Sequence, residues 1–204
     1  MNGSLCGFYL SVALCALSGV ANAAALSVVN ATAADVNCAF EQDCTFTVAS
    51  GSTSFSLPGA NGTAALQMRT FSGKSGLPAT IKHGYEYRLD LTNATTFVDA
   101  SCVTGLEVDF GPVTKLQYNR VGPLDDVFVI NSAPGTIGLA SAQQTGSVIT
   151  FTFAQPVCAG DTSGTGKSTF FFGLASTGAL AVITAKVEEF AGAVIRVRAG
   201  APQH

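Results

Sequence analysis

Paired acidic side chains are the residues of this chain best placed to do chemistry. Glu107 and Asp109 stand two positions apart, in a stretch where apolar and charged residues alternate. On a β-strand such residues share one face, and their carboxylates lie about 6–7 Å apart. This separation suits the acid–base pair of a glycoside hydrolase. The same pattern also marks the solvated face of an ordinary strand, and no aromatic cluster beside it suggests a sugar subsite.

A second acidic pair, Asp125 and Asp126, follows a Gly-Pro turn. Carboxylates in a loop, completed by backbone carbonyl oxygens, are ligands that Ca²⁺ prefers. Glu41 and Asp43 form a comparable pair inside a short loop between two cysteines. Neither pair matches a DxDxDG calcium loop, and a solvated acidic turn is the alternative. Asp125 and Asp126 are therefore the predicted metal ligands, and Ca²⁺ is the only cofactor that the sequence suggests.

His83 is the only histidine inside the chain, since the other ends it. A Ser-His-Asp triad would need His83 as its base, with Asp90 or Asp99 to orient the ring. The sequence has no GxSxG motif to supply the nucleophile. Lys82 and Gly84 on either side favour an exposed turn histidine, and we predict no catalytic residue.

Tyr118 is the one tyrosine of the mature chain that strand alternation leaves outside the core. Sugar rings stack on exposed aromatic side chains, and the chain has no tryptophan. Tyr118 is therefore the only candidate platform for a bound glycan.

The charge of the chain excludes nucleic acid as a partner. Only 11% of the residues are charged, the net charge is −3, and the ten Lys and Arg residues are scattered. Nucleic-acid binding needs a dense basic patch to neutralise phosphates.

The N-terminal segment predicts export. An apolar run over residues 8–20 closes on Ala21-Asn22-Ala23, a small-x-small site of the kind that signal peptidase cuts. We predict a signal peptide over residues 1–23 and a single domain over residues 24–204. The apolar run is too short to span a bilayer. No second apolar segment approaches spanning length, so we expect no transmembrane segment in the mature chain. The predicted location is secreted, at the cell surface or in the periplasm.

Four cysteines remain after the predicted cleavage: Cys38, Cys44, Cys102 and Cys158. An even number in an exported chain indicates two disulfides, for which three connectivities exist. Proximity in sequence favours Cys38–Cys44, which leaves Cys102–Cys158.

Alternation of apolar and polar residues with period two dominates the mature chain. The clearest case is the segment 85–91, in which Tyr85, Tyr87 and Leu89 point to one face and Glu86 and Arg88 to the other, solvated face. A hairpin across Gly111-Pro112 would pair residues 106–110 with 113–119. Further strands are expected at 26–30, 45–49, 53–57, 64–71, 127–131, 147–154, 169–175, 180–187 and 194–198.

Helix signals are scarce, and clusters of Gly, Pro, Ser and Asn separate the expected strands. About ten to twelve short strands predict an all-β, antiparallel β-sandwich of jelly-roll or immunoglobulin-like type, with a barrel as the alternative.

The sequence GKSTFFFGLAS at 166–176, preceded by QPVC at 155–158, resembles the last strands of bacterial exported β-sandwich proteins. These are the ectodomains found with PEP-CTERM sorting tails, and most have no characterised function. The end of the sequence, 198–204, does not match such a tail. The resemblance therefore implies export and a sandwich, but neither surface sorting nor a ligand.

Together these observations predict an exported, non-enzymatic, disulfide-bonded β-sandwich protein with a structural, adhesive or surface-interaction role. Its expected partner is an extracellular protein or a polysaccharide surface. Two alternatives stay open: a glycan- or Ca²⁺-binding module, and a secreted carbohydrate-active hydrolase that uses Glu107 and Asp109.

Overall fold

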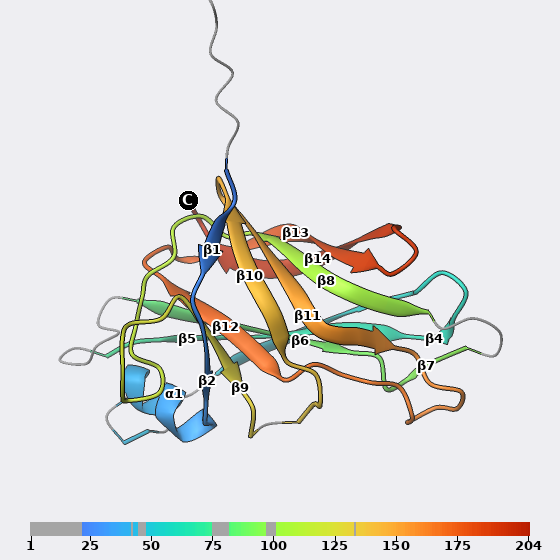
Figure 1. Ribbon diagram of the computed structural model, residues 1–204, viewed down its shortest axis with the longest axis horizontal. Coiled ribbons are helices and arrows are strands. Elements are labelled where there is room, and N and C mark those ends of the chain that lie inside the picture. The colour runs from blue at the N-terminus through green and yellow to red at the C-terminus, as the bar shows by residue number, and fades with distance from the viewer. Residues whose placement is uncertain (1–21, 42, 45–47, 75–81, 97–100, 133) are drawn as a thin grey trace, which may run out of the picture.

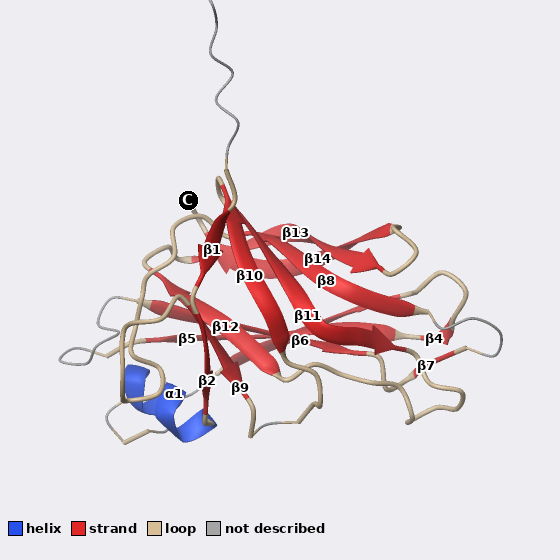
Figure 2. Cartoon of the chain, in the orientation of Figure 1, coloured by secondary structure: helices blue, strands red, loops and turns tan. Residues whose placement is uncertain are grey.

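The computed structural model describes residues 22–204 apart from 42, 45–47, 75–81, 97–100 and 133. This part of the chain forms fourteen strands and one helix, α1 (Ala33–Phe40). Twelve of the strands lie in two six-stranded sheets that face each other (Figures 1 and 2). The prediction of an all-β, largely antiparallel sandwich is confirmed, with more strands than the ten to twelve expected.

The first sheet, called sheet A here, contains six strands. In spatial order they are β1 (Ala24–Leu26), β10 (Leu139–Thr145), β11 (Val148–Cys158), β8 (Cys102–Asp109), β13 (Leu180–Glu189) and β14 (Val194–Pro202). All neighbouring pairs in sheet A are antiparallel. Strands β1 and β14 form its two edges.

The second sheet, sheet B, also contains six strands. In spatial order they are β2 (Val28–Ala31), β9 (Val127–Ile130), β12 (Phe171–Ser176), β6 (His83–Asp90), β5 (Ala64–Ser72) and β3 (Ala49–Phe55). Its pairs are antiparallel except β2 with β9, which run parallel. Two short strands, β4 (Asn61–Gly62) and β7 (Ala94–Thr95), pair with each other.

The predicted hairpin across Gly111-Pro112 is wrong. After β8 the chain leaves sheet A and crosses to the outer side of sheet B, where Thr114 and Leu116 form only isolated bridges to Ala175 and Asp125. The Gly-Pro pair ends one strand here without starting its partner. Of the predicted strand 45–49, residues 45–47 lie outside the described residues.

Helix α1 was not predicted. It begins after Thr32, whose side chain accepts a hydrogen bond from the Asp35 N–H, while Asp35 lies in the first turn. Both features stabilise a helix N-terminus. The helix buries Val36 and Phe40 against sheet B. It is eight residues long, and no helix in the described residues is long and apolar enough to cross a membrane.

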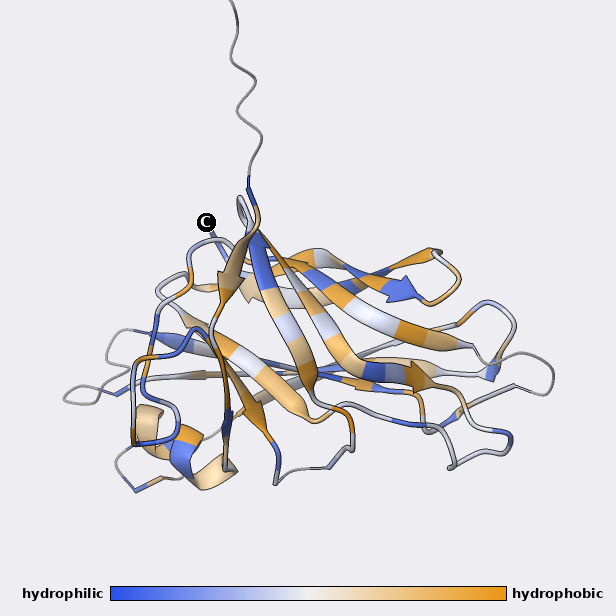
Figure 3. Ribbon diagram, viewed as in Figure 1, coloured by the Kyte–Doolittle hydropathy of each residue, from blue (hydrophilic) through white to orange (hydrophobic). Residues whose placement is uncertain are grey.

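The main core lies between the two sheets, where their inward side chains meet. Apolar residues, orange in Figure 3, recur along the strands of both sheets. Tyr85 and Tyr87 of β6 point into this core, as predicted, and are fully buried. The Tyr85 ring packs edge-on against Phe110, with ring centroids 5.4 Å apart, and Phe151 packs against Phe172 at 4.9 Å.

A second apolar layer covers the outer face of sheet B. It is formed by α1, by the segment around Leu116 and Tyr118, and by outward rings of the sheet. Two glycines on interior strands make room for these rings. The Phe71 ring occupies the position that a Cβ of residue 84 would take, and Phe128 lies 2.7 Å from a Cβ built on Gly173.

This second layer corrects one prediction. The sequence pattern placed Glu86 and Arg88 on a solvated face, and they do point away from the main core. Both are nevertheless buried, with exposed fractions of 1% and 8%. Arg88 donates hydrogen bonds to Asp90, to Gln67 and to Ser168 at 2.8–2.9 Å, so its burial is compensated.

Both predicted disulfides are present, Cys38–Cys44 and Cys102–Cys158. The first joins α1 to the residues just after it. The second joins cross-strand partners of β8 and β11, so it lies within sheet A and does not connect the two sheets.

We predict that the two bridges stabilise the fold unequally. They close loops with sequence separations of 56 and 6. From loop entropy, the double variant Cys102→Ser with Cys158→Ser should lose about 4 kcal/mol of the free energy of unfolding. The double variant Cys38→Ser with Cys44→Ser should lose only about 2 kcal/mol. Urea unfolding of both double variants tests this, and equal losses would show that loop closure is not the main contribution.

Candidate functional site

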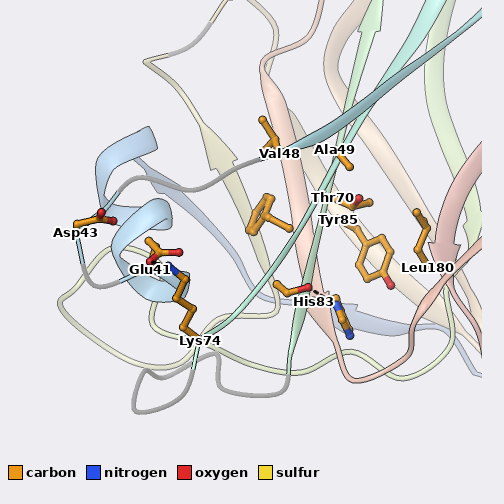
Figure 4. Close-up of a pocket in the computed structure, with 11 residues that line it drawn as sticks. Glu41, Asp43, Val48, Ala49, Thr70, Lys74, His83, Tyr85 and Leu180 are labelled. Carbon is orange, nitrogen blue, oxygen red and sulfur yellow. Dashed lines mark hydrogen bonds and ion pairs between the residues drawn. The ribbon is translucent and has the colours of Figure 1, made fainter.

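One pocket, called the end pocket below, lies at one end of the sandwich, beside α1. It encloses about 870 Å³ and is lined by the end of β5, the starts of β3, β6 and β13, and the residues that follow α1. In Figure 4, Glu41, Asp43 and Lys74 lie on the α1 side of this pocket, and Tyr85 and Leu180 on the opposite side.

The polar groups of the end pocket are paired with one another. Lys74 donates to the buried carboxylate of Glu41, and this hydrogen bond raises the pKa of the Lys74 amine. His83 Nδ1 lies 2.8 Å from the Ser72 hydroxyl. A ligand entering this pocket would therefore compete with existing contacts. Glu41, a sequence candidate for Ca²⁺, is used in an ion pair here.

His83 is the first residue of β6 and not a turn residue, which corrects the prediction. Its contact with Ser72 arises because the two residues are cross-strand partners in the β5–β6 ladder. Asp90 ends the same strand, eight residues long, so it cannot orient the His83 ring. Asp99 lies outside the described residues. The structure therefore places a serine and a histidine together without bringing Asp90 to them.

A second candidate surface is the outer face of sheet A, called the open face below. Its outward residues form rows that cross the sheet at matched register. One row contains Gln143, Thr150, Glu107, Lys186 and Arg196, and all five are polar or charged. Among the described residues no helix or apolar layer covers this face, in contrast to the outer face of sheet B.

The predicted pair Glu107 and Asp109 lies on the open face, but the two carboxylates have separate partners. Glu107 accepts a hydrogen bond from Lys186 at 2.6 Å, and Asp109 lies 3.3 Å from His204 Nε2. The carboxylate that interacts with Glu107 is instead Glu188.

Glu188 belongs to β13, the strand next to β8, and its carboxylate lies over Gly105, which offers no side chain to displace it. Partial burial raises the pKa of Glu188, and the charge and hydrogen bond of Glu107 raise it further, against the opposing effect of Lys186. The two carboxylates can accept hydrogen bonds from hydroxyl groups. Sequence reasoning missed Glu188 because it lies 81 positions from Glu107 and one residue beyond the predicted strand 180–187.

The predicted Ca²⁺ ligands Asp125 and Asp126 are both buried, with exposed fractions of 7% and 5%. Asp126 Oδ2 accepts hydrogen bonds from the N–H and the hydroxyl of Ser27, each at 2.9 Å, and lies 3.0 Å from Lys115 Nζ. Ser27 is the residue at which the chain passes from β1 in sheet A to β2 in sheet B. Asp126 therefore fixes this crossing.

The contacts of Asp126 keep its carboxylate charged. Burial raises its pKa, but the bonds from Ser27 and Lys115 outweigh this effect and hold the pKa below its usual range. The described residues contain no group of three or more His, Cys, Asp or Glu side chains able to hold a metal ion. The assignment of Ca²⁺ to this pair stays a prediction.

Tyr118 does not form a sugar platform, which corrects the prediction. The side chain is fully buried in the layer over sheet B. Its ring packs against Phe128 at a centroid distance of 4.7 Å. The sequence could not show this burial, because it depends on the irregular segment 112–126 folding back over the sheet.

Glu86 is a buried carboxylate with a strongly displaced pKa. Burial raises its pKa to about 7, although the charge of Arg69 acts in the opposite direction. Glu86 Oε2 lies 3.7 Å from Arg69 Nη1, too far for a hydrogen bond. The Arg69 guanidinium in turn stacks on the Phe171 ring, 3.8 Å from its centroid. The Glu86 carboxylate is buried on the face of sheet B that carries the second apolar layer.

Comparison with known proteins adds no functional assignment: no protein-family model, curated protein or solved structure matches the chain.

We predict that Asp126→Asn destabilises the fold by about 1–3 kcal/mol at pH 7, because the Ser27 donors and Lys115 lose a charged acceptor. A group with a lowered folded-state pKa stabilises above its unfolded pKa, so the difference from wild type should shrink as the pH falls below about 4. Chemical unfolding at several pH values measures this effect.

Asp125→Asn is the matched control, and we expect it to lower the free energy of unfolding much less than Asp126→Asn does. The same samples test the calcium prediction. A saturable rise in melting temperature with Ca²⁺ in wild type, absent in Asp126→Asn, would identify Asp126 as a metal ligand.

We predict that Glu86→Gln stabilises the protein at pH 8 and not at pH 5. The raised pKa means that folding is most favoured when Glu86 is protonated, and this stability is lost as the pH rises from about 4.5 through about 7. The raised pKa of Glu86 corresponds to a gain in the free energy of unfolding of Glu86→Gln at pH 8 on the order of 3 kcal/mol at most. Thermal unfolding across this pH range measures it, and an equal effect at both pH values would contradict the buried, proton-linked role.

Proposed function

We propose that this protein is exported and works by contact, in a structural or adhesive role, with the open face of sheet A as its contact surface. The observation that carries the proposal is the unequal covering of the two sheets. The outer face of sheet B has its own apolar layer, whereas the open face presents a row of hydroxyl, amide and charged side chains, with the exposed Leu180 and Val182 toward one end of β13. Such a face offers many hydrogen-bonding groups without a deep cleft.

Export is supported by the predicted signal peptide and by the two disulfides, which persist in oxidising compartments. The resemblance to exported bacterial sandwich proteins agrees with this location. Strand β1 begins at Ala24, the first residue after the predicted cleavage site. N-terminal sequencing of protein collected outside the producing cells should therefore begin at Ala24.

The partner best suited to the open face is a polysaccharide surface. Threonine, glutamine and carboxylate side chains in register can bond to the repeated hydroxyl groups of an extended glycan. Glu107 and Glu188 would accept such bonds while Lys186 donates. The hydrolase alternative shares these carboxylates, but it would additionally require release of sugar from the polymer.

We expect oxidised protein to co-sediment with at least one of cellulose, chitin and peptidoglycan, and the double variant Gln143→Glu with Thr152→Glu to lose this retention. Both residues are exposed on the open face, so the added charges affect its surface and leave the core intact. Pelleted and free fractions measure the effect.

The matched control is Asn131→Glu with Ser163→Glu, which adds the same charge at exposed positions outside this face. Equal retention of the two double variants would show that the open face is not the contact surface. Absence of retention on all three polymers would count against a polysaccharide partner.

A further inference from the structure

A groove runs between the free edges of the two sheets. It has a volume of about 530 Å³, and its first wall is β3, of which residues 49–54 all contribute. Its second wall is made by Leu180 and Val182 of β13 and by Arg198 and Gly200 of β14. We call this feature the edge groove. It follows a strand edge for six residues, which is the shape that an extended chain fills.

Strand β3 presents an unprotected edge to this groove. It pairs only with β5, so alternate backbone N–H and C=O groups face away from the sheet. Among the described residues these groups have no hydrogen-bond partner. Residues 49–54 read Ala-Ser-Gly-Ser-Thr-Ser and include no charge and no proline, the usual means of blocking edge-to-edge pairing.

The opposite wall combines exposed apolar and basic groups. Leu180 and Val182 are 54% and 67% exposed. Arg198 is exposed on β14 and has no carboxylate partner among the described residues.

We propose that the edge groove binds an extended segment of a partner protein in which apolar and acidic residues alternate. The segment adds a strand to the free edge of β3 through backbone hydrogen bonds. Its apolar side chains contact Leu180, Val182 and Met68, and a carboxylate pairs with Arg198. This binding goes beyond the proposed role of the open face and does not depend on it.

A second copy of the chain is a weaker occupant. The strand that it would offer to the groove by edge-to-edge pairing is β3, which contains no carboxylate within residues 49–54. Such pairing would leave Arg198 without an acidic partner. The charge of the groove therefore selects a different, acidic segment.

The first experiment measures binding of a labelled, capped heptapeptide of alternating Val and Glu to the full oxidised chain, by fluorescence anisotropy. We expect saturable binding that is about tenfold weaker for the same peptide with Lys in place of Glu, because like charges are then brought together. In an extended peptide, the N–H groups of alternate residues point to the same edge. N-methylation of the residues along one edge should therefore abolish binding, whereas N-methylation along the other edge should leave binding unchanged, because an added strand pairs through a single edge.

Arg198→Glu should reverse the charge preference, so that the Lys peptide binds and the Glu peptide does not. Lys167→Glu is the matched control, because it makes the same charge change at an exposed position outside the groove. Thermal unfolding confirms that both variants are folded. The open-face variant Gln143→Glu with Thr152→Glu should bind the peptide as wild type does, which separates this proposal from the polysaccharide role.

Four results would overturn the proposal. One is equal affinity for the Glu and Lys peptides. Another is binding that survives N-methylation whichever of the two edges is methylated. The third is a dimer in solution, measured by light scattering, that Val182→Glu dissociates, because a second copy would then occupy the groove. Failure of both peptides to bind at millimolar concentration would also reject strand addition at β3.

Discussion

The hydroxyl groups of Tyr85 and Tyr87 are enclosed between the two sheets, and each must find an acceptor there. A buried hydroxyl without a partner costs about 1–3 kcal/mol. Tyr85 donates to the carbonyl of Gly178 and Tyr87 to that of Gly200, both at 2.7 Å. These bonds extend from an interior strand of sheet B to the β13–β14 side of sheet A. Burial accordingly raises the pKa of Tyr85 to about 12, and the hydroxyls stay protonated donors.

These two bonds also determine the shape of the free side of the sandwich. Gly200 has its carbonyl bound by Tyr87, and its N–H points to Met68 Sδ at 2.9 Å. One end of β14 is therefore held close to sheet B, while residues further along the strand keep an exposed edge. The edge groove is thus a space between two fixed walls and does not require rearrangement to form.

Much of this fold could be predicted from period-two alternation. The inward orientation of Tyr85, Tyr87 and Leu89 followed directly from the sequence, and so did both cysteine pairs. What alternation cannot show is whether the second face of a strand meets water or another layer. Glu86 and Arg88 were assigned to solvent for this reason, although α1 and the segment 112–126 seal that side. The signal for α1 was present in Thr32 and Asp35, but eight residues are too few to show a clear helical period.

The candidate surfaces were predictable only in part. Glu107 could be placed on an outward face because it lies in a regular strand. Its true neighbour Glu188 comes from a strand distant in sequence, and only the pairing of β8 with β13 brings the two together. Asp126 and Tyr118 lie in or beside an irregular connection, where no periodicity reports burial. Both turned out to hold the structure together at positions where the sequence suggested a ligand.

The Cys102–Cys158 bridge has a consequence for the protein under mechanical tension. Strands β8, β9, β10 and β11 all lie within the segment that this bridge closes. A pull on the N-terminal end first acts on β1 and β2, each held along a single neighbour. Once these strands, α1 and β3 to β7 have peeled away, the force passes through the bridge and not along the enclosed chain. Residues between the two cysteines cannot be drawn out, so the extension of the molecule under load is limited covalently, whatever the strength of its hydrogen bonds.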